Sequence, residues 1–399
     1  MTSFIPRPLQ KCEKCQGDAL NLSQAKPTPK QLNLNKLSDA GGSQIHWLSD
    51  AGRFTFLERS RYNIAIIGAT GAVGQEMLKL LEQRGFPVKA IRCFASPQSV
   101  GKTVLFKKKK IPVEKLSETC FQGIDIALFS AGKKISLAYA PLAVKAGCLV
   151  VDNSSAYRMD PKVPLVIPEI NSHALENHSG IISSPNCTAT VMLMALAPLH
   201  RQFKIRRVVM ATYQAASGAG QKAMTELQEE SRAFLENRPY TRTVMPFPYA
   251  FNLFPHNAPM TASGYNEEEI KVIEEARKIL EEPNLRIAVT CVRVPVLRAH
   301  CESLNVEFEN PITAQEAKII LQKSPGVTVL EEWDQNRFPM PLDATGHDHI
   351  FVGRIRQDLS NSNTLDLWAA GDQLLKGAAL NAIQIAENFI EIGSRISRN

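Results

Sequence analysis

Several features that would assign this sequence to a non-enzymatic class are missing from it. Its 399 residues contain no run of about 18 apolar residues, so the sequence predicts no membrane-spanning helix. Basic residues form no stripe interleaved with aromatics and the net charge is a modest +7, which favours a small anionic ligand over nucleic acid. The eight cysteines are scattered through a long chain, a usage typical of a reducing compartment rather than of a disulfide framework.

The segment 1–60 lacks hydrophobic periodicity. It is rich in Ser, Asn, Gln, Lys and Pro, and we expect a polar extension with little packed structure. Cys12 and Cys15 form a Cys-x-x-Cys pair, but no second pair stands at zinc-finger spacing, so no metal site is predicted. Acidic residues are scarce at the start, as in a transit segment, but so is arginine. We expect a cytoplasmic protein, or a plastid one if this segment acts as a transit peptide.

The first regular structure predicted is a strand, a glycine turn and a helix. Residues 62–67 form an apolar run, and Gly-Ala-Thr-Gly-Ala-Val-Gly follows at 68–74 at the start of an amphipathic helix that ends near residue 84. Glycines let a backbone approach a pyrophosphate, and a helix N-terminus supplies N–H groups to it. A tight turn without a ligand is the alternative, but the context favours dinucleotide binding. The residues assigned to the cofactor here are Gly68, Thr70, Gly71, Ala72, Val73 and Gly74.

The next predicted strand, 88–94, bears on the choice of cofactor. NAD enzymes carry an acid after this strand for the ribose 2′-hydroxyl, and none is present here. Ser96 and Ser99, with Arg92 and Lys102 near in sequence, can accommodate a 2′-phosphate. The sequence therefore predicts NADP rather than NAD.

Strands and helices continue to alternate through residue 187, which predicts an α/β fold with a parallel, Rossmann-type sheet. Ligands of such sheets bind at the carboxyl ends of the strands. We expect the residues at these ends to line one crevice: Ser130, Gly132, Asp152, Asn153, Ser154, Asn186 and Cys187. Beyond residue 205 the strands lengthen and crossover helices become fewer, which predicts an α+β substrate domain with a mostly antiparallel sheet. The predicted boundaries are 61–187 for the dinucleotide-binding domain, completed by 360–399, and 188–359 for the second domain.

Cys187 is the candidate nucleophile. It lies where a strand at 180–182 leads into an apolar helix, and the N–H groups and dipole of a helix N-terminus favour a thiolate. A buried structural cysteine is the alternative. Arg293 and His300, seven residues apart at a strand end, are predicted to meet over a cleft.

Glu268 and Lys271 lie three apart on one predicted helix face, where they either reach a common ligand or form a solvated ion pair. The other histidines are interpreted as structural or surface residues: His46, His173, His178, His200, His256, His347 and His349.

Taken together, these stretches resemble the aspartate-semialdehyde dehydrogenase family from about residue 62 to 392. The matching stretches are the glycine turn at 68, Val-Asp-Asn-Ser-Ser-Ala-Tyr-Arg at 151, Ser-Pro-Asn-Cys at 184, Tyr-Gln-Ala-Ala-Ser-Gly-Ala-Gly at 213, Glu-Glu-Glu-Ile-Lys at 267, Arg-Val-Pro-Val-Leu-Arg-Ala-His at 293 and Lys-Gly-Ala-Ala-Leu-Asn at 376. The resemblance implies NADPH-dependent conversion of L-aspartyl 4-phosphate to L-aspartate 4-semialdehyde and phosphate, a step toward lysine (by way of diaminopimelate), threonine and methionine. It also implies a homodimer built through the second domain, or a tetramer.

The resemblance assigns roles as well. Cys187 forms a thioester, His300 moves protons, and Gln214 positions the intermediate. The implied substrate ligands are Arg293 for the carboxylate, Glu268 for the ammonium, and Arg158, Lys271 and Asn186 for the phosphate, with the Asn186–Cys187 backbone near the oxyanion. Ser217, Gly218 and Asn381 complete the implied cofactor site, with Ser130 and Gly132.

Two other functions fit parts of the sequence. N-acetyl-γ-glutamyl-phosphate reductase shares the chemistry but needs no partner for an ammonium group, so Glu268 discriminates against it. A noncatalytic cofactor-binding relative is the other alternative, and the presence of Cys187, His300 and Gln214 argues against it.

The sequence departs from the family pattern at two positions. Gln98 stands where many relatives have arginine, and Lys133 stands where glycine is common.

Overall fold

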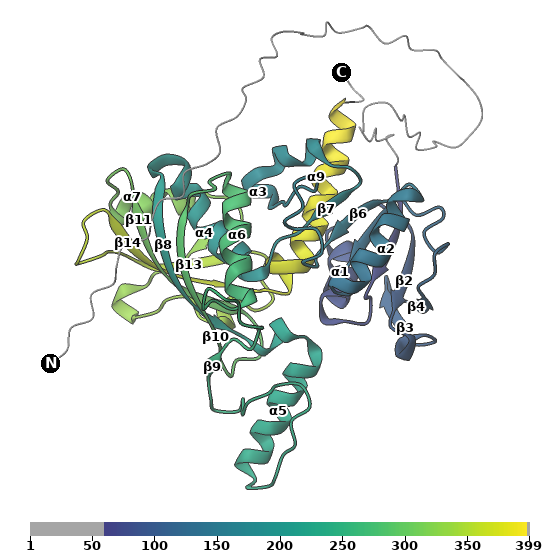
Figure 1. Ribbon diagram of the computed structural model, residues 1–399, viewed down its shortest axis with the longest axis horizontal. Coiled ribbons are helices and arrows are strands. Elements are labelled where there is room, and N and C mark those ends of the chain that lie inside the picture. Colours follow the sequence, from purple (N-terminus) through teal and green to yellow (C-terminus); the bar gives the residue numbers. More distant parts are fainter. Residues whose placement is uncertain (1–59, 397–399) are drawn as a thin grey trace, which may run out of the picture. The chain divides into compact units, whose positions relative to one another are not determined.

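The computed structural model describes residues 60–396, and two seven-stranded sheets organise them (Figure 1). The expectations for residues 1–59, including the Cys12–Cys15 pair and His46, lie outside this range. None of the helices among residues 60–396 is long and apolar enough to span a membrane.

The first sheet has the strand order β3-β4-β2-β1-β5-β6-β7, and its strands are parallel apart from the β3–β4 hairpin. The strands are β1 (Tyr62–Ile67), β2 (Val88–Ala95), β3 (Thr103–Phe106), β4 (Lys109–Lys115), β5 (Ile126–Phe129), β6 (Leu149–Asp152) and β7 (Ile181–Ser183). Helices α1 (Ala72–Gln83) and α2 (Lys133–Lys145) are the crossovers after β1 and β5. The predicted parallel α/β sheet is confirmed, and its central strands are apolar because both faces are covered.

The turn from β1 into α1 requires glycine at two positions. Gly68 has φ +96°, and a Cβ there would lie 2.7 Å from the carbonyl oxygen of Ser130. A Cβ on Gly74 would lie 2.3 Å from the carbonyl oxygen of Gly68. Gly71 caps α1 without a side-chain hydrogen bond, and the first turn of the helix holds no acidic residue. The positive N-terminal end of α1 is therefore not compensated by any side chain of its first turn.

The C-terminal helix α9 (Leu380–Ile396) lies against α1, and Figure 1 shows it in yellow beside the first sheet. Ile383 of α9 and Leu81 of α1 share one hydrophobic core. A π-helical turn, η5 (Leu375–Ala379), precedes α9 and contacts α4. A Cβ on Gly377 of this turn would lie 2.8 Å from the Cβ of Cys187, so the glycine allows η5 to approach the cysteine closely.

The second sheet has the order β12-β13-β14-β11-β8-β10-β9. Its strands are β8 (Ile205–Gln214), β9 (Phe254–Pro255), β10 (Arg286–Arg293), β11 (His300–Phe308), β12 (Val327–Val329), β13 (Ile350–Gln357) and β14 (Thr364–Gly371). The prediction of a mostly antiparallel sheet is confirmed, but the sheet is mixed, since β8 pairs with β10 and β12 with β13 in parallel. Parallel pairing of β8 and β10 is possible because the connection between them, which contains α5 and α6, returns the chain to the end of the sheet where β8 began.

Helices cover one face of the second sheet and form its core. They are α4 (Cys187–Phe203), α6 (Glu267–Leu280) and α7 (Ala314–Gln322), with the short α3 (Pro168–Asn171) and α8 (Pro341–Ala344) elsewhere. Leu193 of α4, Ile273 of α6 and Leu304 of β11 belong to this core. Helix α5 (Gln221–Leu235) extends away from the sheet in Figure 1 and has a small core of its own with Tyr249.

Candidate active site

Cys187 is the first residue of α4, four residues after β7 ends at Ser183. The strand-to-helix transition predicted at this cysteine is therefore present. Asn186 caps the helix: its Oδ1 accepts from the Thr188 N–H at 2.9 Å and the Ala189 N–H at 3.3 Å. The cap fixes the first turn and leaves the Cys187 side chain at the helix N-terminus.

A cavity of about 380 Å³ lies over Cys187. It is lined by residues from the loops and helices that connect the strands of the two sheets. The predicted residues that line it are Val73, Ser130, Gly132, Asn153, Ser154, Arg158, Asn186, Cys187, Ser217, Gly218, Glu268 and Arg293. The strand-end residues apart from Asp152, which is fully buried, thus meet at one crevice. The remaining predicted residues are not part of its lining: Gly68, Thr70, Gly71, Ala72, Gly74, Ser96, Ser99, Asp152, Gln214, Lys271, His300 and Asn381.

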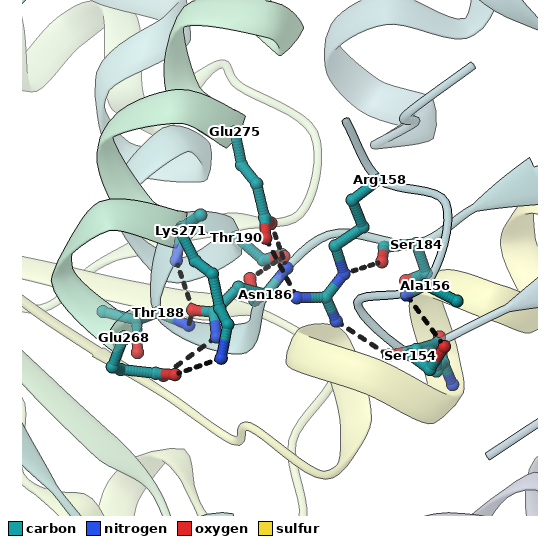
Figure 2. Close-up of polar contacts among 12 residues, drawn as sticks. Ser154, Ala156, Arg158, Ser184, Asn186, Thr188, Thr190, Glu268, Lys271 and Glu275 are labelled. Carbon is teal, nitrogen blue, oxygen red and sulfur yellow. Dashed lines mark hydrogen bonds and ion pairs between the residues drawn. The ribbon is translucent and has the colours of Figure 1, made fainter. Parts of the chain in front are cut away.

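A buried ion pair supports the turn before Cys187 (Figure 2). The Arg158 guanidinium contacts Glu275 of α6 at 3.0 Å and donates to the carbonyl oxygens of Ser184 at 3.0 Å and Asn153 at 2.7 Å. The other carboxylate oxygen of Glu275 accepts from the Asn186 N–H at 2.5 Å. This network joins the end of β6, α6 and the turn that carries the cysteine.

Because Glu275 takes the Asn186 N–H, that group is not available to an oxyanion. The prediction that the Asn186–Cys187 backbone stabilises the oxyanion is therefore corrected for Asn186. The Cys187 N–H lies in the first helical turn, where N–H groups have no acceptor within the helix. Only the Cys187 half of the predicted pair is free of this ion-pair network.

The electrostatics of Cys187 contradict the expectation that its position favours a thiolate. Burial raises the pKa of the Cys187 thiol to about 11, and the nearby Glu268 carboxylate adds to the rise. Arg293 and Arg158 oppose these effects without cancelling them. At neutral pH the free protein holds Cys187 as a thiol, because burial and the Glu268 carboxylate together outweigh the two arginines.

We expect alkylation of Cys187 to report this raised pKa. Below the pKa the thiolate fraction grows ten-fold per pH unit, so inactivation by iodoacetamide should accelerate about 100-fold from pH 7 to pH 9. Cys187 is the target because the other cysteines in the described range are buried. The measurement is the second-order inactivation rate against pH, with Cys187→Ser as the unreactive control. A rate that levels off below pH 8 would show a thiolate stabilised in the free protein.

His300 and Gln214 lie directly behind the cavity wall. The Nδ1 atom of His300 accepts from the Ala215 N–H at 3.0 Å, which assigns the proton of the neutral ring to Nε2. Burial, then the charges of Arg293 and His256, hold the pKa of His300 well below its ordinary range. A Cβ on Gly218 would lie 3.0 Å from this Nε2, so only glycine leaves it open toward the cavity. Gln214 donates to the Thr188 hydroxyl at 2.6 Å, and its Oε1 is buried without a hydrogen-bond partner.

Arg293 and Glu268 place opposite charges in one cavity. Arg293 donates to the Ala215 carbonyl oxygen at 3.0 Å, and its Nε is buried without an acceptor. Burial tends to raise the pKa of Glu268, but His256, the hydrogen bond from Asn186 (2.8 Å) and nearby cations lower it overall. Lys271 lies 3.6 Å from Glu268, the i,i+3 ion pair that the helix spacing allowed. Glu268 is therefore ionised at neutral pH.

Two sequence-based assignments are wrong for physical reasons. Asn381 does not reach the cavity: it is fully buried and bonded to Ser184 Oγ, the Val166 carbonyl oxygen and Lys376. Arg92 is not free for a 2′-phosphate, because it forms a bidentate pair with Glu114 and donates to the Cys120 carbonyl oxygen. Both side chains satisfy their hydrogen bonds inside the fold.

The sequence also left two functional candidates unrecognised. Glu275 faces Arg158 across 117 positions, and no local pattern distinguishes it from the other acids of its helix. His256 was interpreted as structural or surface, but it lines the cavity beside Arg293.

Within residues 60–396, no three His, Cys, Asp or Glu side chains are grouped to hold a metal ion.

Comparison with known families identifies the class. The NAD-binding domain of semialdehyde dehydrogenases matches residues 63–178, and their dimerisation domain matches residues 196–376. The two matched regions contain most of the parallel sheet and the whole mixed sheet, with Cys187 between them in sequence. The fold is thus that of a semialdehyde dehydrogenase.

Individual relatives narrow the class to one family. The chain is 53% identical to the aspartate-semialdehyde dehydrogenase of Synechocystis sp., over 84% of this chain and 99% of the relative, and 43% identical to that of Bacillus subtilis, over 82% and 97%. The crystal structure of aspartate semialdehyde dehydrogenase II from Vibrio cholerae superimposes with a TM-score of 0.81 at 39% identity, covering 83% of this chain and 99% of that one. The chain belongs to the aspartate-semialdehyde dehydrogenase family.

Proposed function

We propose that this protein reduces L-aspartyl 4-phosphate to L-aspartate 4-semialdehyde with NADPH, releasing phosphate, through a thioester on Cys187. The observation that carries the proposal is the single cavity that holds a cysteine at a helix start, the Arg293 cation and the Glu268 carboxylate. A thiol between two fixed charges of opposite sign suits an α-amino acid with a reactive side-chain carbonyl.

The residues of the first sheet fit NADP. The close contacts at Gly68 and Gly74 and the uncapped start of α1 form a cradle for a pyrophosphate. Thr70 and Ser99 lie together at the ends of β1 and β2, 3.4 Å apart, where a 2′-phosphate would find hydroxyl donors. Lys102, exposed nearby, supports NADP in place of Arg92. The bound cofactor supplies hydride exchange at the acyl carbon.

The chain's own residues perform the acyl transfer. The Cys187 sulfur bonds to the 4-acyl carbon as the bond from that carbon to the phosphate oxygen breaks, and the thiol proton passes to the departing phosphate, which leaves a thioester. His300 presents its Nε2–H toward the cavity, where it donates to the oxygen that gains negative charge. The unpartnered Gln214 Oε1 lies beside the first turn of α4 and accepts from a substrate donor.

The charged residues orient the substrate. Arg293 holds the α-carboxylate and Glu268 the α-ammonium. For phosphate, Arg158 and Asn186 line the cavity, although the Arg158 guanidinium already has three acceptors within the protein. We infer that Arg158 contributes mainly its charge to the phosphate site, and that Lys271, beside Glu268, adds a second cation from outside the lining.

The assay of the reverse reaction tests the proposal. With aspartate semialdehyde and NADP, the formation of NADPH should depend on inorganic phosphate, because phosphate releases the acyl group from Cys187. NAD in place of NADP should give lower kcat/KM. Formation of NADPH at a steady rate without phosphate would overturn the proposed reaction, and equal efficiency with NAD would overturn the cofactor assignment.

Glu268→Gln should separate this function from reduction of an N-acylated substrate. Loss of a charge-assisted bond to the ammonium should lower kcat/KM for aspartate semialdehyde about 10- to 100-fold. The matched control is Glu274→Gln on the same helix, whose side chain pairs with Arg277 at the surface. Unchanged kcat/KM in Glu268→Gln would favour a substrate without a free ammonium group.

The second domain bears on how the protein assembles. The matched dimerisation domain supports a dimer formed through the second sheet's region, and we propose a homodimer as the functional unit or as half of a tetramer. The expected compartment is the cytoplasm, or the plastid if residues 1–59 act as a transit segment.

A further inference from the structure

His256 has a hydrogen-bonding conflict that the free protein does not resolve. The residue follows β9, and its own N–H is bonded to the Cys291 carbonyl oxygen of β10 at 2.8 Å, so its backbone is fixed. Its Nδ1 faces the Ala258 N–H at 3.2 Å, and its Nε2 faces Arg293 Nη2 at 2.7 Å. Both ring nitrogens thus face groups that only donate.

A neutral imidazole has one lone pair for two such donors. Burial, and then the charge of Arg293, lower the pKa of His256 to about 4, so the ring is neutral at physiological pH. The ring therefore has two tautomers: either Nε2 accepts from Arg293 with the proton on Nδ1, or Nδ1 accepts from Ala258 with the proton on Nε2. In the second tautomer the Nε2–H and the Arg293 N–H converge on the same space at the cavity wall.

An oxygen anion is the ligand that resolves this arrangement, because it accepts from both N–H groups at once. Arg293 also has an Nε that is buried without an acceptor, so the guanidinium has further capacity for an anion. Glu268 acts electrostatically on His256, but its two carboxylate oxygens face Asn186 and Lys271 instead of His256 or Arg293. We therefore look to a ligand for the anion.

We propose that His256 is a second ligand of the substrate's α-carboxylate, donating from Nε2 beside Arg293. The proposal rests on the proposed function and adds a specificity residue to it. His256 contributes a directed hydrogen bond at the carboxylate end of the substrate.

The test compares substrates that lack one end of aspartate semialdehyde. In His256→Ala, KM for aspartate semialdehyde should rise about ten-fold with kcat changed less than about three-fold. Succinate semialdehyde, which keeps the carboxylate, should lose affinity equally, and 3-aminopropanal, which lacks it, should be unaffected. Each analogue is measured as a substrate or, where turnover is slow, as a competitive inhibitor. His256→Gln, which can place an amide N–H near Nε2, should recover part of the affinity, and the exposed His349→Gln should match wild type.

Several results would overturn the proposal. An equal loss with 3-aminopropanal would mean that His256 only supports the cavity wall. In an Arg293→Lys background, the addition of His256→Ala should raise KM again; no further rise would show that His256 acts only by orienting Arg293. Failure of the wild-type protein itself to use aspartate semialdehyde would instead refute the proposed function. Thermal unfolding of each variant shows whether it is folded.

Discussion

Cys187→Ser should reduce turnover of aspartate semialdehyde on the order of 10⁴-fold or more while leaving the protein folded and able to bind NADP. Serine differs from cysteine by one atom, so the packing against Gly377 and the start of α4 is retained. A serine hydroxyl, however, ionises far less readily than even the raised thiol of Cys187. The covalent acyl intermediate cannot form, and hydride exchange has no thioester to act on.

Rapid mixing measures this directly. Without phosphate, the wild-type protein with aspartate semialdehyde and NADP should give a burst of one NADPH per site and an acylated Cys187 detectable by intact mass. Cys187→Ser should give neither signal, with an unfolding midpoint close to that of wild type. Residual turnover above about 1% of wild type would mean that the reaction does not proceed through a thioester on this residue.

Breaking the Arg158–Glu275 pair should have the largest effect on stability. Both side chains are nearly fully buried, at 9% and 1% exposure, so removal of one leaves the other charge unpaired inside the protein. Glu275→Ala should lower the free energy of unfolding by about 3–5 kcal/mol. It should also lower kcat, because the Asn186 N–H loses its acceptor and the turn before Cys187 loosens.

A double variant and a surface pair give the controls. Arg158→Met combined with Glu275→Leu should recover much of the stability but not kcat, since apolar side chains fill the space without bonding Asn186 or the Ser184 carbonyl oxygen. Glu229→Ala breaks the exposed Arg232–Glu229 pair and should change stability by less than about 1 kcal/mol. Urea unfolding and steady-state kinetics measure both quantities. A fully stable Glu275→Ala would show that the pair contributes little.

Local chemistry explains why much of the fold was predictable from sequence. The strand, glycine turn and helix at β1 and α1 depend on residues within about twenty positions of each other, and hydrophobic periodicity together with glycine conformational preference determines them. The same holds for Cys187 at the start of α4, because the apolar run after it and the capping residue before it are adjacent in sequence. Side chains at the ends of parallel strands then meet by topology.

Contacts between distant segments account for what the sequence missed. His256, the partner of Arg293, is 37 positions away in sequence, and Glu275, the partner of Arg158, is 117 positions away. Sequence spacing therefore indicates neither of these contacts. Asn381 was assigned to the cofactor from the family resemblance and Arg92 from its position in sequence, but both side chains form hydrogen bonds that only the packed fold creates.

The sequence by itself determined that a cysteine stands at a helix start and that a glycine turn joins the first strand to its helix, because each part is a local pattern. Only the tertiary structure decided the state of that cysteine. The turn η5 packs against Cys187 at Gly377, and burial of the thiol, with the nearby Glu268 carboxylate of α6, raises its pKa to about 11. Desolvation depends on everything packed around a group, and no stretch of sequence contains that information.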